Sequence, residues 1–289
     1  MRVETMKLLQ CTKCCGDLDQ MVDGLICRSC QTRYPSVGQT VCFLDTETAH
    51  PSDGIPDSLL VKIKNWLKRY PQFYNILVYI FGASNAGVSP KAFLDKYVTT
   101  GQIVVNLGAG PQKRRPNTLQ VDMFAFPEID VAADLEKLPF KGGSIHAVFC
   151  TSVLEHVIDS KAVLVEIRRI LKPGGFCYLT VPFMYPFHSS PHDYMRWTLQ
   201  GLESFVEKSG FKKIDSGLRH GPTTALILIF VDWVAAILSF GSVRIFETIS
   251  ILGMAILAPF AHIFDFWLNR LKVSRNIASG FYYIGEKKD

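Results

Sequence analysis

Two pairs of cysteines near the start of the chain have the spacing of metal ligands. Two residues separate Cys11 from Cys14 and Cys27 from Cys30, and twelve residues lie between the pairs. Each pair can sit on a tight turn, so four thiolates can surround one tetrahedral zinc ion, with Cys15 as a bystander. No histidine lies among them, which predicts a structural zinc site in a module too small to fold on its own core. Two disulfides or four free thiols are the alternative.

A glycine turn followed by two acids predicts a nucleoside site in the middle of the chain. An apolar run over 103–105 leads into the Gly-Ala-Gly loop at 108–110, as a buried strand leads into a tight turn. A dinucleotide-binding loop would have a third glycine where this chain has Lys113. Asp122 and Asp134 end the next two apolar runs, where the first can accept hydrogen bonds from ribose hydroxyls and the second can reach an adenine amine. We therefore expect a nucleoside that carries something other than a pyrophosphate.

A third group of reactive side chains follows in the segment 182–198, which is dense in His, Tyr, Asp, Arg and Trp. A loop at this point of an α/β sheet would cover a bound ligand. A hydroxyl substrate benefits from a base that accepts its proton. The candidates for this base are His156, His188, His192 and Asp193. Each also has a purely structural interpretation, as a packing or surface histidine, or as the partner of Arg196 in an ion pair.

Short apolar runs rich in Val, Ile and Phe predict the strands that position these residues. We expect strands at 102–107, 119–122, 130–133, 147–150 and 176–181. A helix between the last two begins at Asp159 or Ser160 and ends at the Pro-Gly-Gly of 173–175, and a second begins at Thr198. Alternating strands and helices imply an α/β fold with a doubly wound sheet, whose ligands lie at the carboxyl ends of the strands.

Three of these segments together resemble class I S-adenosylmethionine-dependent methyltransferases of the small-molecule type (methyltransferase type 11-like). They are VVNLGAG at 104–110, DLEKLPFKGGSIHAVFCTSVLEHV at 134–157 and EIRRILKPGGFCYLTVPF at 166–183. The resemblance covers about 102–211 and implies a Rossmann-like sheet, S-adenosylmethionine as the cofactor and methyl transfer as the reaction. The residues that it implies for cofactor binding are Asn106, Gly108, Ala109, Gly110, Asp122, Met123, Asp134, Leu135 and Thr151.

Two positions depart from the family, and one segment narrows the substrate. Asn106 stands where these enzymes usually have an acid, and His146 replaces a common aspartate at the start of the fourth strand. The string Pro-x-His followed by Pro-x-Asp-Tyr-x-Arg, within 186–196, resembles a subset linked to cell-surface sugars and lipids. This likeness implies a small-molecule acceptor of sugar or lipid-linked type. Of the two atoms that could accept the methyl group, oxygen and nitrogen, we expect oxygen.

The cysteine segment has a likeness of its own. LLQCTKC at 8–14 and LICRSCQTRYPSVGQTVCFL at 25–44 resemble the zinc-ribbon activator protein that partners several tRNA and translation-factor methyltransferases. The likeness implies a zinc ribbon over 1–46, here fused to its enzyme. A linker with N-terminal helices would follow over 47–100, and the methyltransferase domain over 101–289.

Two apolar stretches, at 223–240 and 249–267, dominate the last third of the chain and approach the length that spans a bilayer. Asp232 interrupts the first, and Pro259 and Asp265 break up the second. Strand-like segments flank both, at 212–218 and 280–288, so 219–277 reads as a hydrophobic helical insertion between the last two strands of the sheet. Both ends then return to one sheet, which allows two membrane crossings or none.

We expect this insertion to form a helical hairpin on the cytoplasmic leaflet of a membrane. Basic residues that suit anionic headgroups flank it, namely Arg219, Arg244, Arg270, Lys272 and Arg275. A soluble helical cap, a dimer interface and a two-pass anchor are the alternatives.

The composition agrees with a peripheral membrane protein in the cytoplasm. The 289 residues are 48% hydrophobic and 20% charged, and the formal net charge of +5 is spread along the chain. No long apolar stretch opens the chain, which predicts no signal peptide. An RNA methyltransferase that uses the zinc ribbon to bind nucleic acid is one alternative function, although no stripe of basic and aromatic residues favours it. A noncatalytic scaffold is another, which Asn106 would support, and the basic tripeptide at 113–115 leaves phosphate binding open.

Overall fold

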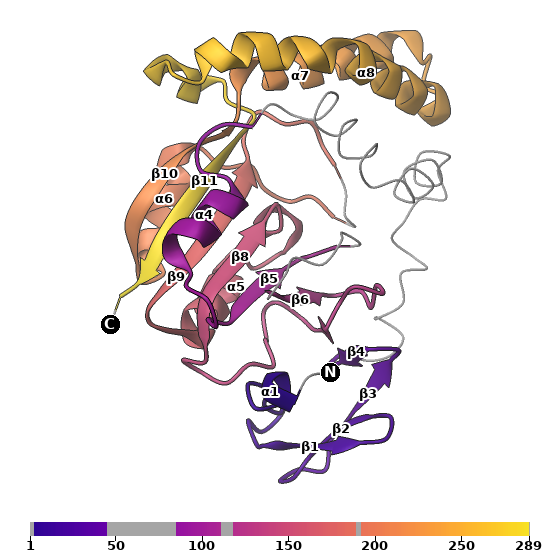
Figure 1. Ribbon diagram of the computed structural model, residues 1–289. Coiled ribbons are helices and arrows are strands. Elements are labelled where there is room, and N and C mark those ends of the chain that lie inside the picture. Colours follow the sequence, from indigo (N-terminus) through magenta and orange to yellow (C-terminus); the bar gives the residue numbers. More distant parts are fainter. Residues whose placement is uncertain (1–2, 45–84, 111–117, 189–191, 289) are drawn as a thin grey trace.

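The computed structural model describes residues 3–44, 85–110, 118–188 and 192–288 (Figure 1). Most of the predicted linker and N-terminal helices of 47–100 therefore lies outside the described residues, as does the basic tripeptide at 113–115. Everything below concerns the described part of the chain.

A single sheet runs from the cysteine module to the end of the chain, in the order β1-β2-β3-β4-β7-β6-β5-β8-β9-β11-β10. Its strands are β1 (Leu18–Met21), β2 (Gly24–Cys27), β3 (Arg33–Val37), β4 (Thr40–Cys42), β5 (Val104–Leu107), β6 (Thr118–Asp122), β7 (Val131–Ala132), β8 (Ile145–Thr151), β9 (Leu171–Pro182), β10 (Phe211–His220) and β11 (Gly280–Lys287). The five strands predicted for the middle region are confirmed, and they pair in parallel in the order β7-β6-β5-β8-β9.

The last two strands close the sheet in the antiparallel sense. β11 lies between β9 and β10 and runs antiparallel to both. The strands predicted on either side of the apolar insertion are thus confirmed as neighbours, and the insertion leaves and re-enters the sheet at one end. His220, the last residue of β10, pairs with Gly280, the first of β11.

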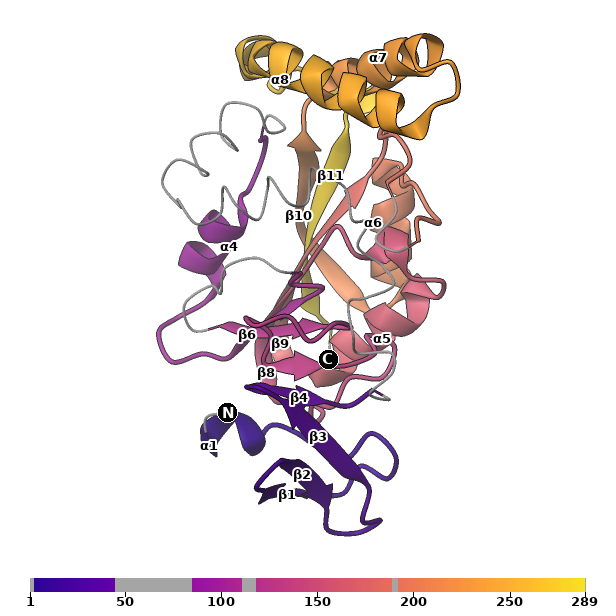
Figure 2. The ribbon, with the colours of Figure 1, turned by 90° about the vertical axis from the view of Figure 1, so that its right-hand side faces the viewer.

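Helices cover both faces of the sheet, with α4 on one side and α5 and α6 on the other (Figure 2). Their bounds are α1 (Val3–Met6), α4 (Pro90–Tyr97), η2 (Leu154–His156), α5 (Ser160–Ile170), α6 (Leu199–Lys208), α7 (Pro222–Leu238), α8 (Val243–Leu268) and η3 (Lys272–Asn276). Asp159 caps α5 and Thr198 caps α6, as the sequence predicts. The Pro-Gly-Gly of 173–175 does not end α5, because the helix stops at Ile170 and the tripeptide belongs to β9.

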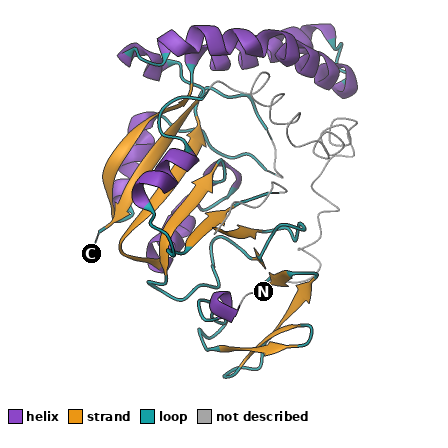
Figure 3. Ribbon diagram, viewed as in Figure 1, coloured by secondary structure: helices purple, strands orange, loops and turns teal. Residues whose placement is uncertain are grey.

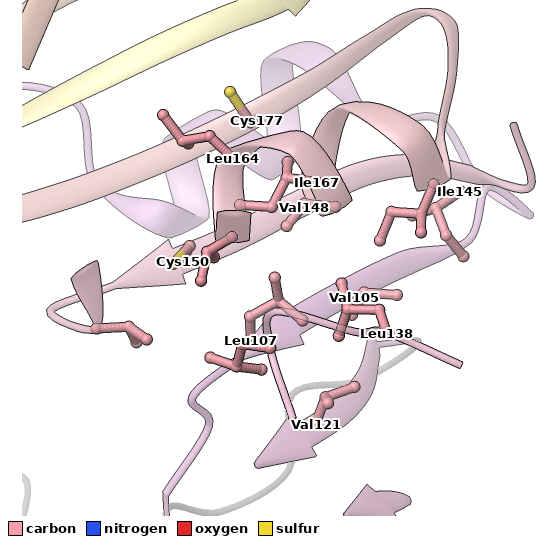
Figure 4. Close-up of a cluster of buried hydrophobic side chains, with 14 of the residues drawn as sticks. Val105, Leu107, Val121, Leu138, Ile145, Val148, Cys150, Leu164, Ile167 and Cys177 are labelled. Atoms are coloured by element: carbon pink, nitrogen blue, oxygen red, sulfur yellow. The ribbon is translucent and has the colours of Figure 1, made fainter. Parts of the chain in front are cut away.

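The core lies between β5, β8 and α5 on one face of the sheet (Figure 4). Val105, Val148 and Ile167 are completely buried there. Alternate residues of the same strands point to the other face, where Phe149 of β8 packs edge-on against Phe93 of α4, with ring centroids 5.2 Å apart. Because both faces are covered, the central strands read as continuous apolar runs, which is why the sequence reveals them.

The cysteine module joins the edge of the central sheet. Its last strand, β4, pairs in parallel with β7, so that Val41 lies opposite Val131. Lys141 Nζ also lies 2.6 Å from Asp17 Oδ1, across the junction. The module is therefore continuous with the sheet through backbone hydrogen bonds.

The apolar insertion forms two long helices, α7 and α8, that lie across the end of the molecule opposite the cysteine module (Figures 1 and 3). A short turn over 239–242 connects them. Pro259 and Asp265 break the run of apolar residues but not the helix, because α8 continues through both. The predicted helical hairpin is therefore confirmed as a structure.

Candidate functional site

The four predicted zinc ligands come together in the cysteine module. The Sγ atoms of Cys11 and Cys30 are 3.5 Å apart and those of Cys14 and Cys27 are 3.4 Å apart, and all four lie within 4.8 Å of one another. A disulfide needs about 2.05 Å between sulfurs. Tetrahedral thiolate ligands of zinc lie about 3.8 Å from one another, so the donor set fits the ion.

The backbone around these cysteines supports the same conclusion. The residue after each second cysteine, Cys15 and Gln31, has a positive φ of 59° and 58°. Each turn thereby directs backbone N–H groups to sulfur, as from Cys30 N to Cys27 Sγ at 3.5 Å. The hydroxyl of Tyr34 lies 3.1 Å from Cys11 Sγ. Cys15 is exposed and outside the cluster, as predicted.

The glycine loop and the acid after β6 meet at the carboxyl edge of the sheet. Gly108 and Gly110 have positive φ values of 64° and 60°, which favour glycine. Asp122, at the end of β6, is buried, and its Oδ2 accepts a 2.8 Å hydrogen bond from Gly110 N. Its Oδ1 accepts from Phe124 N at 3.0 Å. Burial raises the pKa of Asp122, although both backbone donors oppose the shift.

The other predicted cofactor residues line the same edge. Ala109 N donates to Val121 O, and Asp122 O accepts from Ala133 N, so the ends of three strands are tied together. Around them lie the exposed Met123 and Asp134, the buried Leu135, and Thr151 at the end of β8. The structure brings all of these predicted residues to one edge.

The two departures from the family have structural partners. Asn106 Nδ2 donates a 2.9 Å hydrogen bond to Gln120 Oε1 on the neighbouring strand, so its amide is held within the sheet. His146 Nδ1 accepts from Ile103 N at 3.0 Å. It lies near the start of β8, at the edge away from the glycine loop, as predicted.

The turn after β8 carries a candidate site residue that the sequence analysis missed. Glu155 of η2 is completely buried, and neither carboxylate oxygen has a hydrogen-bond partner among the described residues. Its Oε1 lies 3.9 Å from His156 Nε2 and 3.8 Å from His188 Nε2. Burial raises its pKa to about 7 and lowers that of His188. An acid directly before His156, in LEHV, was the available signal.

Asp193 and Arg196 hold the loop that follows β9. The guanidinium binds both carboxylate oxygens, at 2.5 and 2.6 Å, which confirms the anticipated pair. Arg196 also donates to the carbonyl oxygens of Tyr185 and Pro186. Asp193 Oδ2 accepts from His188 N at 2.8 Å, and the neighbouring guanidinium lowers the pKa of this carboxyl to about 2. Asp193 therefore positions His188 rather than facing open space.

The ring of His156 contacts the backbone of His192. His156 Nδ1 lies within hydrogen-bond distance of His192 O. The His192 ring is exposed beside Tyr194, with centroids 5.6 Å apart. Of the four predicted bases, His156 and His188 lie beside Glu155, Asp193 lies behind His188, and the His192 ring is apart.

This loop also touches the apolar insertion. Met184 N donates to Ala278 O, in the segment that leads from α8 back to β11. The negative charge of Asp232, on α7, adds to burial in raising the pKa of Tyr185. The loop that carries His188 is therefore linked to the end of the α7–α8 hairpin through Met184 and Tyr185.

Comparison with known proteins finds a family whose model matches the central part of the chain. Residues 109–179 match the family described as "Methyltransferase domain". The ubiquinone/menaquinone biosynthesis C-methyltransferase UbiE of Desulfotalea psychrophila is 33% identical over 109 residues, which are 35% of this chain and 41% of that protein. The reducing polyketide synthase Preu2 of Preussia isomera is 30% identical over 99 residues, which are 34% of this chain and 4% of that protein. The chain thus spans less than half the length of either relative.

Among solved structures, a complex between the Haloferax volcanii Trm112 methyltransferase activator and a putative methyltransferase is similar, with a TM-score of 0.43 and 18% identity. The match covers 80% of this chain and 98% of that one.

Proposed function

Because the centre of this chain is a class I methyltransferase domain, we propose that the protein transfers a methyl group from S-adenosylmethionine to a lipid-linked or otherwise apolar acceptor at a membrane surface. The observation that carries the proposal is the contact between the glycine loop and the turn after β8. A Cβ placed on Gly108 would lie 2.3 Å from Val153, so the loop for the cofactor lies directly against the turn that carries Glu155 and His156.

The residues at this edge fit the cofactor. Asp122 is a buried carboxylate at the carboxyl end of β6, where ribose hydroxyls can donate to it. Gly108 and Gly110 present backbone without side chains, and Leu135 offers an apolar surface for the adenine. When bound, S-adenosylmethionine supplies a methyl group on a sulfonium sulfur, and this carbon–sulfur bond breaks as the acceptor oxygen bonds to the methyl carbon.

The acceptor hydroxyl fits beside Glu155, His156 and His188. Transfer to oxygen releases a proton, and a group whose pKa lies near neutrality can accept it. Asp193 holds the backbone nitrogen of His188, and Arg196 holds the carbonyl oxygens of Tyr185 and Pro186 in the same loop. Glu155, His156 and His188 orient the acceptor and take up its proton. Orientation is the larger part of catalysis for an in-line displacement.

The outer surface of the α7–α8 hairpin supports a membrane location. Within the described part of the chain, α8 is the one helix long and apolar enough to cross a membrane, and 17% of its most apolar 18 residues is buried. Exposed large apolar residues cover both helices, including Leu226, Phe230, Trp233, Leu252, Ile256, Phe260, Ile263 and Trp267. A patch of this extent on a soluble protein marks an interaction surface.

Two acidic residues within the apolar helices point inward. Asp232 Oδ1 accepts a 2.8 Å hydrogen bond from Ser250 Oγ, between the two helices. Asp265 is buried against the first turn of α7. Exposed basic residues lie at the ends, among them Arg244, Arg270 and Lys272. A flat apolar face with basic ends suits insertion into the headgroup region of an anionic leaflet.

Calorimetric titration with S-adenosylmethionine tests the cofactor site. Micromolar binding is expected for the full chain, and Asp122→Asn should weaken it about tenfold or more, because the loss of a charged acceptor costs roughly 1.5–3 kcal/mol. Asp95→Asn, in an exposed pair with Lys91, is the matched control. If the folded wild-type protein did not bind S-adenosylmethionine, the result would contradict the proposed function and favour a noncatalytic scaffold.

Vesicle flotation tests the membrane surface. The full chain should float with vesicles of phosphatidylcholine and phosphatidylglycerol, and less with phosphatidylcholine alone. The double variant Trp233→Ser/Trp267→Ser should lose flotation. Val22→Ser/Ile158→Ser removes exposed apolar residues elsewhere and should keep it. Equal flotation of the two double variants, or none by the wild type, would contradict the membrane location.

A further inference from the structure

Three potential metal ligands converge at the turn after β8. They are Glu155 and His156 of η2 and His188 of the loop after β9, and one ligand atom from each lies within 4.8 Å of the others. Both histidines turn Nε2 toward the same oxygen, Glu155 Oε1, at 3.9 and 3.8 Å. Neither distance is a hydrogen bond. The cluster is a separate site from the four cysteines of the zinc module.

Glu155 is the side chain that this arrangement leaves unexplained. It is 0% exposed, and its two oxygens have no hydrogen-bond partner among the described residues. Only its backbone is occupied, where Glu155 O accepts from Tyr194 N at 2.7 Å. An unpartnered buried carboxylate costs several kcal/mol, so the native protein must supply a cation, a proton or a ligand at this point.

The surroundings of the two rings decide among these. His156 Nδ1 faces the carbonyl oxygen of His192, and His188 Nδ1 lies 3.4 Å from both Pro186 O and Asp193 Oδ2. Carbonyl and carboxylate oxygens only accept, so in the neutral form of each ring Nδ1 carries the proton and Nε2 directs a lone pair at Glu155. Two lone pairs directed at a carboxylate repel it unless a cation lies between them. Histidine ligands of metals have this pattern, with Nδ1–H bound to a carboxylate or a carbonyl.

We propose that Glu155, His156 and His188 bind a divalent metal ion of the zinc class. Two imidazole nitrogens and one carboxylate oxygen are a common set for such ions. Tetrahedral ligands at about 2.1 Å from zinc lie about 3.4 Å apart, so each histidine Nε2 needs to approach Glu155 Oε1 by about half an ångström. Three protein ligands leave a coordination position open.

The open position gives the ion a role in the reaction. A bound ion lowers the pKa of a hydroxyl that it contacts and fixes its position, so it would hold the acceptor oxygen and release the proton to water. This role rests on the proposed methyltransferase function and replaces the histidine base. Metal binding by the cluster does not rest on it.

Cobalt substitution of the full chain tests the site. The metal-free protein is reloaded with Co²⁺, which gives an intense sulfur-to-metal charge-transfer band at the cysteine site and only weak d–d bands at a nitrogen and oxygen site. The wild type should bind one more cobalt ion per chain than Glu155→Gln or His188→Gln, and both variants should keep the charge-transfer band. His192→Gln, whose ring lies outside the cluster, should bind as much cobalt as the wild type.

Two results would overturn the inference: cobalt bound only with the sulfur band in the wild type, or Glu155→Gln with unchanged cobalt content. Circular dichroism of each variant establishes that it is folded. Titration of the same samples with S-adenosylmethionine separates this outcome from the proposed function. If the protein binds the cofactor but no second cobalt ion, the metal site is wrong and the methyltransferase proposal is unaffected. If it binds the second cobalt ion but no cofactor, the metal site is supported and the methyltransferase proposal is wrong.

Discussion

Asp265, in the last turn of α8, accepts a 2.7 Å hydrogen bond from the backbone nitrogen of Thr223, in the first turn of α7. Its second oxygen accepts from the backbone nitrogen and the hydroxyl of Thr224, at 3.2 and 3.0 Å. One buried carboxylate thus caps a helix that begins at Pro222, 43 residues earlier. Gly221 is required beside it, because a Cβ there would lie 2.2 Å from Asp265 Cγ.

Asp265→Ala should destabilise the hairpin by roughly 2 kcal/mol, because it removes a cap and leaves buried N–H groups unpaired. Thermal unfolding followed by circular dichroism would measure the loss. Glu247→Ala, which removes an acid near the start of the same helix, should change little. Equal stability of the two variants would show that the contact contributes nothing.

Gly108→Ala should weaken cofactor binding more than Gly110→Ala. Both glycines have φ near 60°, so alanine costs about 1–2 kcal/mol of backbone strain at either position. Among the described residues only Gly108 faces a neighbour, since its added Cβ would lie 2.3 Å from Val153, whereas a Cβ on Gly110 would meet none of them within 4 Å. Calorimetric titration of both variants with S-adenosylmethionine compares them. Matching affinities would argue against a tight contact between the loop and Val153.

Affinity for S-adenosylmethionine should fall on mild acidification. Burial raises the pKa of Asp122 above its ordinary value of 3.8. The ionised carboxylate accepts from ribose hydroxyls, so binding weakens as pH falls through this raised pKa, in a window that lies above pH 3.8. Asp122→Asn should bind weakly at neutral pH and show no such fall. A parallel decline in wild type and variant would assign the titration to another group.

Removal of the Asp193–Arg196 pair should destabilise the protein in a pH-dependent way. Arg196 lowers the pKa of Asp193 from 3.8 to about 2. The stabilisation is therefore complete above pH 3.8 and is lost as pH falls toward 2. Asp193→Asn should cost roughly 2 kcal/mol at neutral pH. Urea unfolding along a pH series would show the gap closing below pH 3.8, and a constant gap would refute this origin.

Metal removal should unfold the cysteine module first. A strong zinc chelator should abolish the amide signals of β1 to β4 in NMR spectra while those of β8 and β9 remain, because the module lacks a large core of its own. Cys14→Ser should have the same effect without chelator. Cys15→Ser keeps all four ligands and should keep the module folded. Loss of folding in Cys15→Ser would mean that the ligand set is wrong.

The sequence by itself determined the features that local patterns control. The central strands follow from apolar runs, because both faces of the sheet are covered. The caps of α5 and α6 follow from Asp159 and Thr198, which bond to N–H groups two or three residues away. The four-cysteine cluster follows from two identical spacings, and the glycine loop from residues that tolerate a positive φ.

Tertiary structure alone decided the features that depend on contacts between distant segments. Glu155 is a metal-ligand candidate only because it is buried and the loop after β9 brings His188 to it. Asp265 interrupts an apolar sequence, yet in the fold it caps a helix 42 residues away. His192 contributes a carbonyl oxygen to His156 rather than its ring. Burial and the direction of a side chain are set by whatever packs against it, and the spacing of residues along the chain carries no record of that neighbour.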